Sequence, residues 1–185
     1  MAATPAAETI YFGYGSNLWL HQMSQRCPES KYLGVGRLNG FRWNISPRGY
    51  ANVIETGSHS SLVSNHAYDN LHRALHENNH DTSASPDGGN SADVLLKKED
   101  SASDFVYGLV FSLTPNDEKR LDKNENVPIA YTKEFIPTDF WSIPENAAKP
   151  EWTDVTKKPH SKTMLVYIDR QRTEDSEPKH EYIFR

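Results

Sequence analysis

One apolar run near the middle of the chain constrains the fold more than any other feature. Residues 105–113 read FVYGLVFSL and form the most apolar run of the 185 residues. Its length and its β-branched and aromatic residues are typical of a buried strand. We therefore expect residues 105–113 to form the central strand of a sheet.

A strand, a turn and a helix are predicted in succession near the start of the chain. Residues 9–14 are rich in β-branched and aromatic side chains and run into the turn-forming residues 15–17. Apolar residues then recur at helical spacing until Pro28. Ser16 or Asn17 is the expected N-cap of this helix.

Five further elements are expected outside residues 58–104. The turn dipeptide at residues 39–40 lies between two strand-like segments and predicts a hairpin of residues 31–38 with 41–45. Additional strands are expected at residues 50–54, 131–136 and 162–169, the last two joined by a proline-rich connection that contains Trp141.

A second helix is predicted directly after the apolar run. Thr114 is a favourable N-cap, and Pro115 suits the first helical position. Two acidic residues follow in the first turn, where the helix dipole favours negative charge. The helix should bury Leu121 and end near residues 124–126.

The segment 58–104 differs from the rest of the chain in composition. It is rich in Ser, Asn, Asp and His and poor in apolar residues, and this predicts a disordered insertion. We expect residues 8–57 and 105–185 to form one domain around it. Three histidines of the segment are spaced four apart, His72, His76 and His80. A short polar segment does little to stabilise a helix, so we favour a solvated loop and predict no metal site.

Composition argues against several classes of partner. The chain has 20 Lys and Arg against 25 Asp and Glu, a net charge of −5, and no dense basic cluster for nucleic acid or an anionic membrane. The single cysteine, Cys27, excludes an intrachain disulfide and a zinc site of several thiolates. No signal-like or membrane-spanning apolar run is present, so we expect a cytoplasmic protein.

The turn after the first strand is the best candidate for a binding site. Residues 13–17 place several backbone N–H groups beside a helix N-terminus, an arrangement that binds phosphate or carboxylate. The segment matches neither the P-loop nor the dinucleotide motif. A purely structural glycine turn is the alternative. Neither Ser16 nor Cys27 has the surroundings expected of a nucleophile.

Three segments resemble the γ-glutamylcyclotransferase family. Tyr11-Phe12-Gly13-Tyr14-Gly15-Ser16-Asn17-Leu18 is similar to its Y-G-S-N signature. Residues 121–127, followed by Tyr131, resemble its second signature, and residues 178–182 resemble a third segment. The resemblance covers nearly all of the chain outside 58–104. It implies an α+β fold, a small mixed β-barrel-like sheet with flanking helices.

The resemblance also implies roles for individual residues. The substrate loop would comprise Tyr11, Phe12, Gly13, Tyr14, Gly15, Ser16, Asn17 and Leu18. Glu125 would transfer the proton as acid and base, and Tyr182 would contact the substrate. Relatives usually carry Gly directly after this Glu, and here the residue is Asn126. Asn tolerates positive φ better than other non-glycine residues, so we expect the turn to persist.

The implied reaction needs no cofactor and takes a small-molecule γ-glutamyl substrate. The α-amine of a γ-glutamyl amino acid attacks its own γ-carbonyl and yields 5-oxoproline and a free amino acid. Two other substrates keep the same chemistry, glutathione and a γ-glutamyl amine, and a non-catalytic binding module is a further alternative. Glutathione-specific relatives usually carry Leu at the position of Asn17, so the sequence favours γ-glutamyl amino acids.

Overall fold

The computed structural model describes residues 7–57, 104–144 and 153–183, without the side chains of Glu181 and Tyr182. Contacts divide the chain into two units, Met1–Thr56 with Asp104–Arg185 and Gly57–Ser103. The strands and helices named below all belong to the first unit. The predicted disorder and the three spaced histidines of 58–104 lie outside the described residues, and the predicted domain boundaries stay a prediction.

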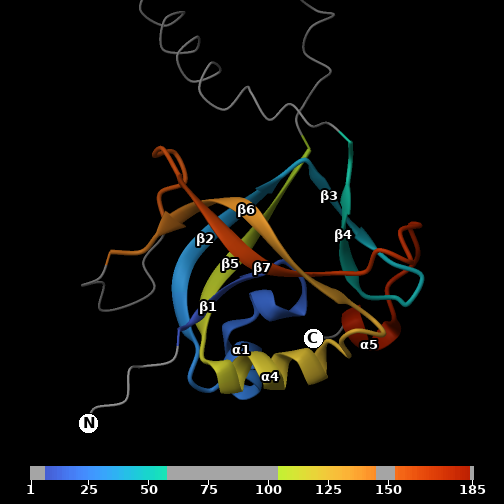
Figure 1. Cartoon of the computed structure of the whole chain (residues 1–185). Coiled ribbons are helices and arrows are strands. Elements are labelled where there is room, and N and C mark those ends of the chain that lie inside the picture. Colours follow the sequence, from blue (N-terminus) through green and yellow to red (C-terminus); the bar gives the residue numbers. More distant parts are fainter. Residues whose placement is uncertain (1–6, 58–103, 145–152, 184–185) are drawn as a thin grey trace, which may run out of the picture. The chain divides into compact units, whose positions relative to one another are not determined.

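Five strands of the described unit close into a small barrel in the order β1-β5-β2-β6-β7 (Figure 1). Their bounds are β1 (Thr9–Gly13), β2 (Lys31–Asn39), β5 (Phe105–Leu113), β6 (Thr132–Ser142) and β7 (His160–Ile168). Strands β1 and β7 pair in parallel, and the other pairs are antiparallel. The predicted mixed barrel is confirmed, with the apolar run at 105–113 between two partners.

Alternate residues of the barrel strands pack into two different cores. On β1, Phe12 joins a cluster with Val166 of β7, and its neighbour Tyr11 joins another with Tyr167. The first cluster includes residues from β2, β5 and β6, and the second includes Leu121 of a covering helix. Successive side chains of a strand point to opposite faces, so both faces are buried at the end of β1 and over residues 164–168 of β7, whereas residues 160–163 of β7 are exposed. This explains why the buried stretches read as continuous apolar runs.

The ring of Phe12 lies against two paired glycines. Gly36 of β2 is opposite Gly108 of β5 in the register. A Cβ on Gly36 would lie 2.8 Å from the Phe12 ring, and one on Gly108 would lie 2.6 Å from it. Glycine at both positions therefore makes room for the aromatic ring in the core.

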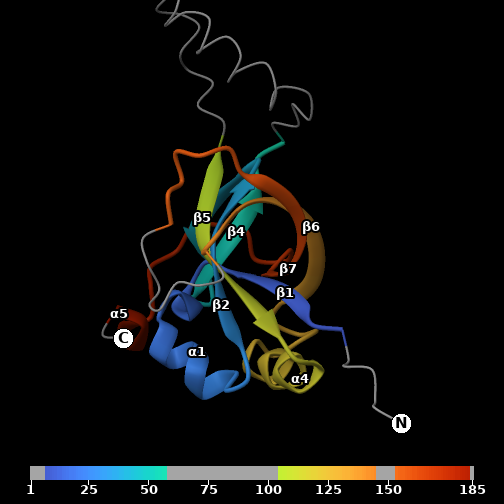
Figure 2. The ribbon, with the colours of Figure 1, turned by 90° about the vertical axis from the view of Figure 1, so that its left-hand side faces the viewer.

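Two helices, α1 (Leu20–Arg26) and α4 (Pro115–Asn124), lie side by side at one end of the barrel (Figure 2). A 3-10 turn, η1 (Ser16–Leu18), precedes α1, and a short helix, α5 (His180–Ile183), lies near the end of the chain. The start of α4 is as predicted, with Thr114 Oγ1 accepting a hydrogen bond from the Asp117 N–H at 3.2 Å. Within the described ranges, no helix is long and apolar enough to cross a membrane.

The predicted N-cap of the first helix is wrong. Trp19 is the N-cap of α1 and makes no capping hydrogen bond through its side chain. Ser16 and Asn17 lie one turn earlier, in η1. The Asn17 amide is engaged by nearby side chains and by Glu125 from a distant segment, and these contacts outweigh the local capping preference.

The predicted hairpin of 31–38 with 41–45 is also wrong. Strand β2 pairs with β5 and β6, whereas β3 (Phe41–Ile45) pairs with β4 (Ala51–Glu55) in a separate two-stranded sheet. The turn at Gly40 redirects the chain, but barrel closure selects the partners of β2. A local turn signal cannot report that long-range pairing.

The strand after residue 131 extends beyond its predicted end. Trp141, expected in a proline-rich connection, lies in β6, which also includes Pro137. The Trp141 side chain is buried and its Nε1–H donates to the Lys157 carbonyl at 2.6 Å. Burial of this ring against the barrel explains why the strand continues past the proline.

Candidate functional site

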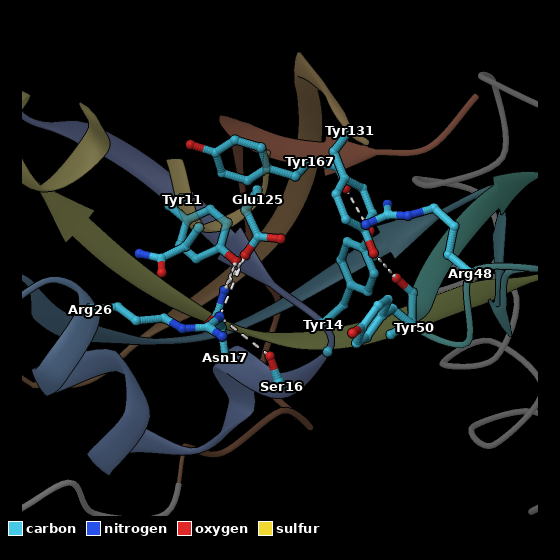
Figure 3. Close-up of a pocket in the computed structure, with 13 residues that line it drawn as sticks. Tyr11, Tyr14, Ser16, Asn17, Arg26, Arg48, Tyr50, Glu125, Tyr131 and Tyr167 are labelled. Atoms are coloured by element: carbon cyan, nitrogen blue, oxygen red, sulfur yellow. Dashed lines mark hydrogen bonds and ion pairs between the residues drawn. The ribbon is translucent and has the colours of Figure 1, made fainter. Parts of the chain in front are cut away.

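A cavity of about 280 Å³ lies between the end of β1 and the turn that follows α4 (Figure 3). Its walls combine the predicted loop with the predicted acid: they comprise Tyr11, Tyr14, Gly15, Ser16, Asn17, Arg26, Arg48, Tyr50, Ala51, Asn124, Glu125, Tyr131 and Tyr167. This volume is near the lower end for small-molecule sites, about 300 Å³. The cavity is lined mainly by tyrosines and charged or amide side chains rather than by aliphatic ones.

Three residues of the predicted loop do not line the cavity. Phe12 is fully buried in the barrel core, because strand alternation sends it away from Tyr11. Gly13 ends β1, and the side chain of Leu18 is exposed. Tyr182 lies in α5, and its side chain falls outside the described residues. Its predicted contact with substrate stays a prediction.

Asn17 connects the loop to the candidate acid. Its Nδ2 donates to the Tyr11 hydroxyl at 2.8 Å and to Glu125 Oε1 at 3.1 Å. Its Oδ1 accepts from Arg26 at 2.8 Å and from Gln22 at 3.3 Å. A guanidinium can only donate, so the Asn17 oxygen must face Arg26 and the amide nitrogen must face Glu125. The orientation of the buried amide is therefore fixed on both sides.

Glu125 occupies the C-cap position of α4 and reaches into the cavity. Its side chain is 17% exposed, and its carboxylate lies 3.7 Å from the Arg26 guanidinium. Burial raises the pKa of Glu125 above its ordinary value, while Arg26, the Asn17 hydrogen bond and Arg48 offset part of that rise. A carboxyl group with a raised pKa that lines a cavity is suited to accept and return a proton.

The residue after Glu125 keeps the tight turn that the sequence predicts. Asn126 adopts a φ of +52°, in the left-handed region. Its carbonyl accepts hydrogen bonds from the N–H groups of Ile129 and Ala130, both at 2.9 Å. Asn at this position therefore supports the backbone turn that holds Glu125 at the cavity.

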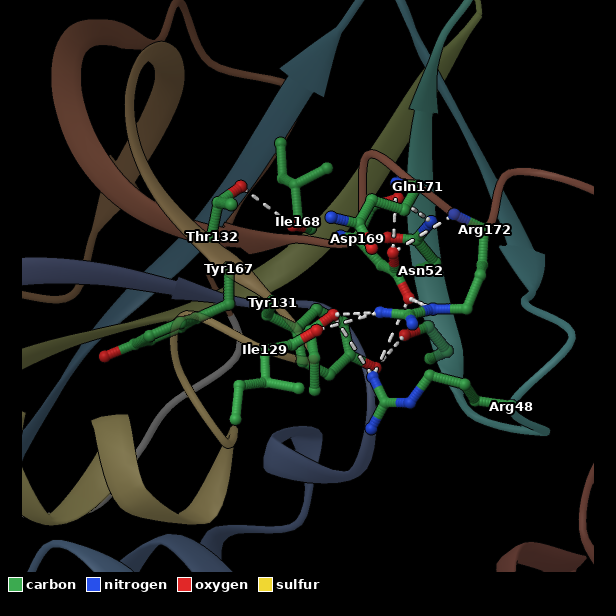
Figure 4. A network of polar contacts seen from close by, with 12 residues as sticks. Arg48, Asn52, Ile129, Tyr131, Thr132, Tyr167, Ile168, Asp169, Gln171 and Arg172 are labelled. Carbon is green, nitrogen blue, oxygen red and sulfur yellow. Dashed lines mark hydrogen bonds and ion pairs between the residues drawn. The ribbon is translucent and has the colours of Figure 1, made fainter.

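Arg48 is a lining residue that the sequence did not indicate. Its guanidinium lies 4.9 Å from the Tyr131 ring centroid and 3.7 Å from a carboxylate oxygen of Asp169 (Figure 4). Asp169 is 1% exposed and also accepts from Arg172 Nε at 2.7 Å. Arg48 lies in the short turn between β3 and β4, and an arginine in such a turn carries no sequence signal for a binding site.

The tyrosines of the cavity are held by hydrogen bonds to well-defined partners. The Tyr167 hydroxyl donates to Asp122 at 2.7 Å, and the Tyr131 hydroxyl donates to the Ala51 carbonyl at 2.8 Å. Burial raises the pKa of both Tyr11 and Tyr167 above the usual range. These phenols stay protonated at neutral pH, so neither is a candidate base.

The described residues provide no alternative metal or nucleophile site. Across residues 7–57, 104–144 and 153–183 there is no cluster of three His, Cys, Asp or Glu that could hold a metal ion. Cys27 is fully buried away from the cavity, and burial with the nearby Asp117 raises the pKa of its thiol to about 12. The Ser16 hydroxyl accepts from the Gln22 amide at 2.9 Å, and an amide cannot act as a general base.

Comparison with known proteins supports the fold of the chain and does not establish its substrate or reaction. No protein-family model matches the chain, and no curated protein matches its sequence. A solved structure titled gamma-glutamyl cyclotransferase is similar, with 16% identity, a TM-score of 0.56, and coverage of 95% of this chain and 74% of that one. An uncharacterized protein from Homo sapiens is also similar, with 16% identity, a TM-score of 0.55, and coverage of 95% and 73%. The chain thus has the fold of a γ-glutamyl cyclotransferase.

Proposed function

We propose that the protein is a γ-glutamylcyclotransferase that converts γ-glutamyl amino acids into 5-oxoproline and a free amino acid. The observation that carries this proposal is Glu125, a partly shielded carboxyl group with a raised pKa that shares one cavity with the loop at residues 14–17. The fold likeness to a protein titled gamma-glutamyl cyclotransferase supports the same reaction.

The charges of the cavity suit a substrate with two carboxylates. Arg26 and Arg48 line it on opposite sides, as Figure 3 shows. A γ-glutamyl amino acid carries one carboxylate on the glutamyl part and another on the leaving amino acid. We assign the glutamyl carboxylate to the side of the loop and Arg26. The leaving amino acid then extends toward Arg48, and the substrate is folded into the conformation that cyclises.

The reaction requires one group that first takes and then returns a proton. In the proposed mechanism the Glu125 carboxylate removes a proton from the substrate α-ammonium. The free amine attacks the γ-carbonyl carbon, a C–N bond forms, and the carbonyl oxygen becomes an oxyanion. Protonated Glu125 then gives its proton to the leaving nitrogen as the oxyanion re-forms the carbonyl group and the original amide C–N bond breaks. The Glu125 carboxylate takes the second proton from the attacking nitrogen, which becomes the N–H of the 5-oxoproline ring, and passes it to the released amine, which leaves as an ammonium group. Atoms and charges balance without a cofactor, a metal or an external nucleophile.

Asn17 holds together the loop side of the proposed site. All four hydrogen-bonding positions of its amide are used by neighbouring side chains. An apolar side chain at this position would leave Arg26 and Glu125 without these partners, and unpaired buried polar groups are costly. The proposed preference for γ-glutamyl amino acids over glutathione rests on the resemblance at Asn17.

The test is product formation from a panel of three substrates. We expect 5-oxoproline from γ-glutamyl-alanine, with a larger kcat/KM than for glutathione or γ-glutamyl-ethylamine. The rate should not change on addition of EDTA, because the mechanism uses no metal ion. A tenfold preference for glutathione would show that glutathione is the substrate, and the proposed cyclisation reaction would still hold. Binding without product would favour a binding module and overturn the enzyme proposal.

A further inference from the structure

The segment before α5 brings a lysine to the turn that forms one side of the cavity. The Ser176 N–H donates to the Ile45 carbonyl at 2.9 Å, and the Lys179 N–H donates to the Gly49 carbonyl at 3.1 Å. A Cβ on Gly49 would lie 2.5 Å from the Lys179 side chain, so the two segments are in close contact. These backbone contacts fix Lys179 beside the β3–β4 turn.

The ammonium group of Lys179 contacts a residue that lines the cavity. Its Nζ is 3.4 Å from the Tyr50 hydroxyl and 4.8 Å from the centroid of the Tyr50 ring. Tyr50 itself lines the cavity, on the same side as Arg48 in Figure 3. Lys179 therefore contacts a lining residue and is separated from the cavity by that one side chain.

The two arginines of the cavity each lie near a carboxylate of the protein. Arg26 lies 3.7 Å from Glu125, and Arg48 lies 3.7 Å from the buried Asp169. No ion pair with a carboxylate is found for Lys179 among the side chains that the structure describes. No carboxylate of the described residues therefore competes with a substrate carboxylate for the charge of Lys179.

We propose that Lys179 is a specificity-determining residue that binds the carboxylate of the leaving amino acid. The inference rests on the proposed function, in which the leaving part extends toward Arg48 and Tyr50. A γ-glutamyl amine has no carboxylate at that position. Lys179 thus favours γ-glutamyl amino acids over γ-glutamyl amines without taking part in the proton transfer.

The experiment compares γ-glutamyl-alanine with γ-glutamyl-ethylamine, which differs by the missing carboxylate. In Lys179→Met we expect KM for γ-glutamyl-alanine to rise about three- to tenfold with little change in kcat, because a partly exposed charge contact contributes modestly. The constants for γ-glutamyl-ethylamine should stay within twofold. Lys179→Arg keeps the charge and should restore the preference for the amino acid substrate.

Lys162→Met is the matched control, since Lys162 is an exposed lysine on β7. The inference is overturned if Lys179→Met leaves the ratio of kcat/KM for γ-glutamyl-alanine to kcat/KM for γ-glutamyl-ethylamine unchanged, or if Lys162→Met lowers that ratio equally.

Calorimetric dissociation constants for both compounds are measured in parallel. Loss of the binding preference in Lys179→Met supports the inference even if no 5-oxoproline forms. The absence of 5-oxoproline would contradict only the proposed reaction. Absence of binding by either compound overturns both.

Discussion

The barrel core and the cavity are built from alternate residues of the same strands, yet they depend on different properties of their side chains. Phe12 and Val166 fill the barrel, whereas their neighbours Tyr11 and Tyr167 line the cavity. The core needs apolar volume of the right shape, and several residues can supply it. The cavity needs particular atoms, because each buried donor or acceptor has a defined partner. Substitutions in the core should therefore mainly lower stability, whereas substitutions in the cavity should mainly lower activity.

The largest expected effect is on catalysis alone. Glu125→Gln keeps the shape of the side chain and removes the group that transfers the proton. We expect kcat to fall by about 10²–10⁴. The thermal midpoint should stay within a few degrees of the parent value. Glu29→Gln, an exposed glutamate outside the cavity, is the control. A kcat within a few-fold of the parent would assign the proton transfer to another residue.

In the barrel core we expect substitutions to lower stability rather than catalysis. Phe12→Ala leaves a void against Gly36 and Gly108 and should lower the free energy of unfolding by about 3–5 kcal/mol. Phe12→Leu retains most of the apolar volume and should cost less than about 2 kcal/mol. Denaturant titration measures both variants. The comparison between the regions breaks down if the folded Phe12→Leu enzyme loses as much activity as Glu125→Gln.

A smaller effect concerns the pH dependence of the reaction. Arg26 favours the ionised form of Glu125, so Arg26→Met should raise the pKa of that carboxyl group further. The proposed first step needs ionised Glu125, and the acidic limb of the kcat/KM profile should therefore move to higher pH. An unmoved limb would show that Glu125 does not govern it. Arg120→Met is a suitable control, because its guanidinium donates to main-chain carbonyls of α1 and lies outside the cavity lining.

The smallest expected effect is on stability as a function of pH. The pKa of Glu125 is raised on folding because the carboxyl group is buried, so the folded state holds this proton more tightly than the unfolded state. Its contribution is fully present below the ordinary pKa of 4.5 and is lost as pH rises through the folded pKa. Glu125→Gln should therefore gain stability relative to the parent as pH increases above 4.5. A difference that is independent of pH would contradict the raised pKa.

The sequence by itself determined the elements that depend on local chemistry. The apolar run at 105–113 predicted the central strand, and Thr114 with Pro115 predicted the start of α4. Asn126 was expected to tolerate positive φ, and it does. These features follow from propensity, capping and backbone sterics within a few residues, so a short stretch of sequence is sufficient to predict them.

Tertiary structure alone decided which segments meet. The partners of β2, the separate β3–β4 sheet and the use of Asn17 as a bridge rather than an N-cap all depend on contacts between distant residues. Arg48 and Lys179 reach the cavity region from a turn and from a segment near the end of the chain. Barrel closure brings these residues together, and the pairing of distant strands is not encoded in local sequence periodicity.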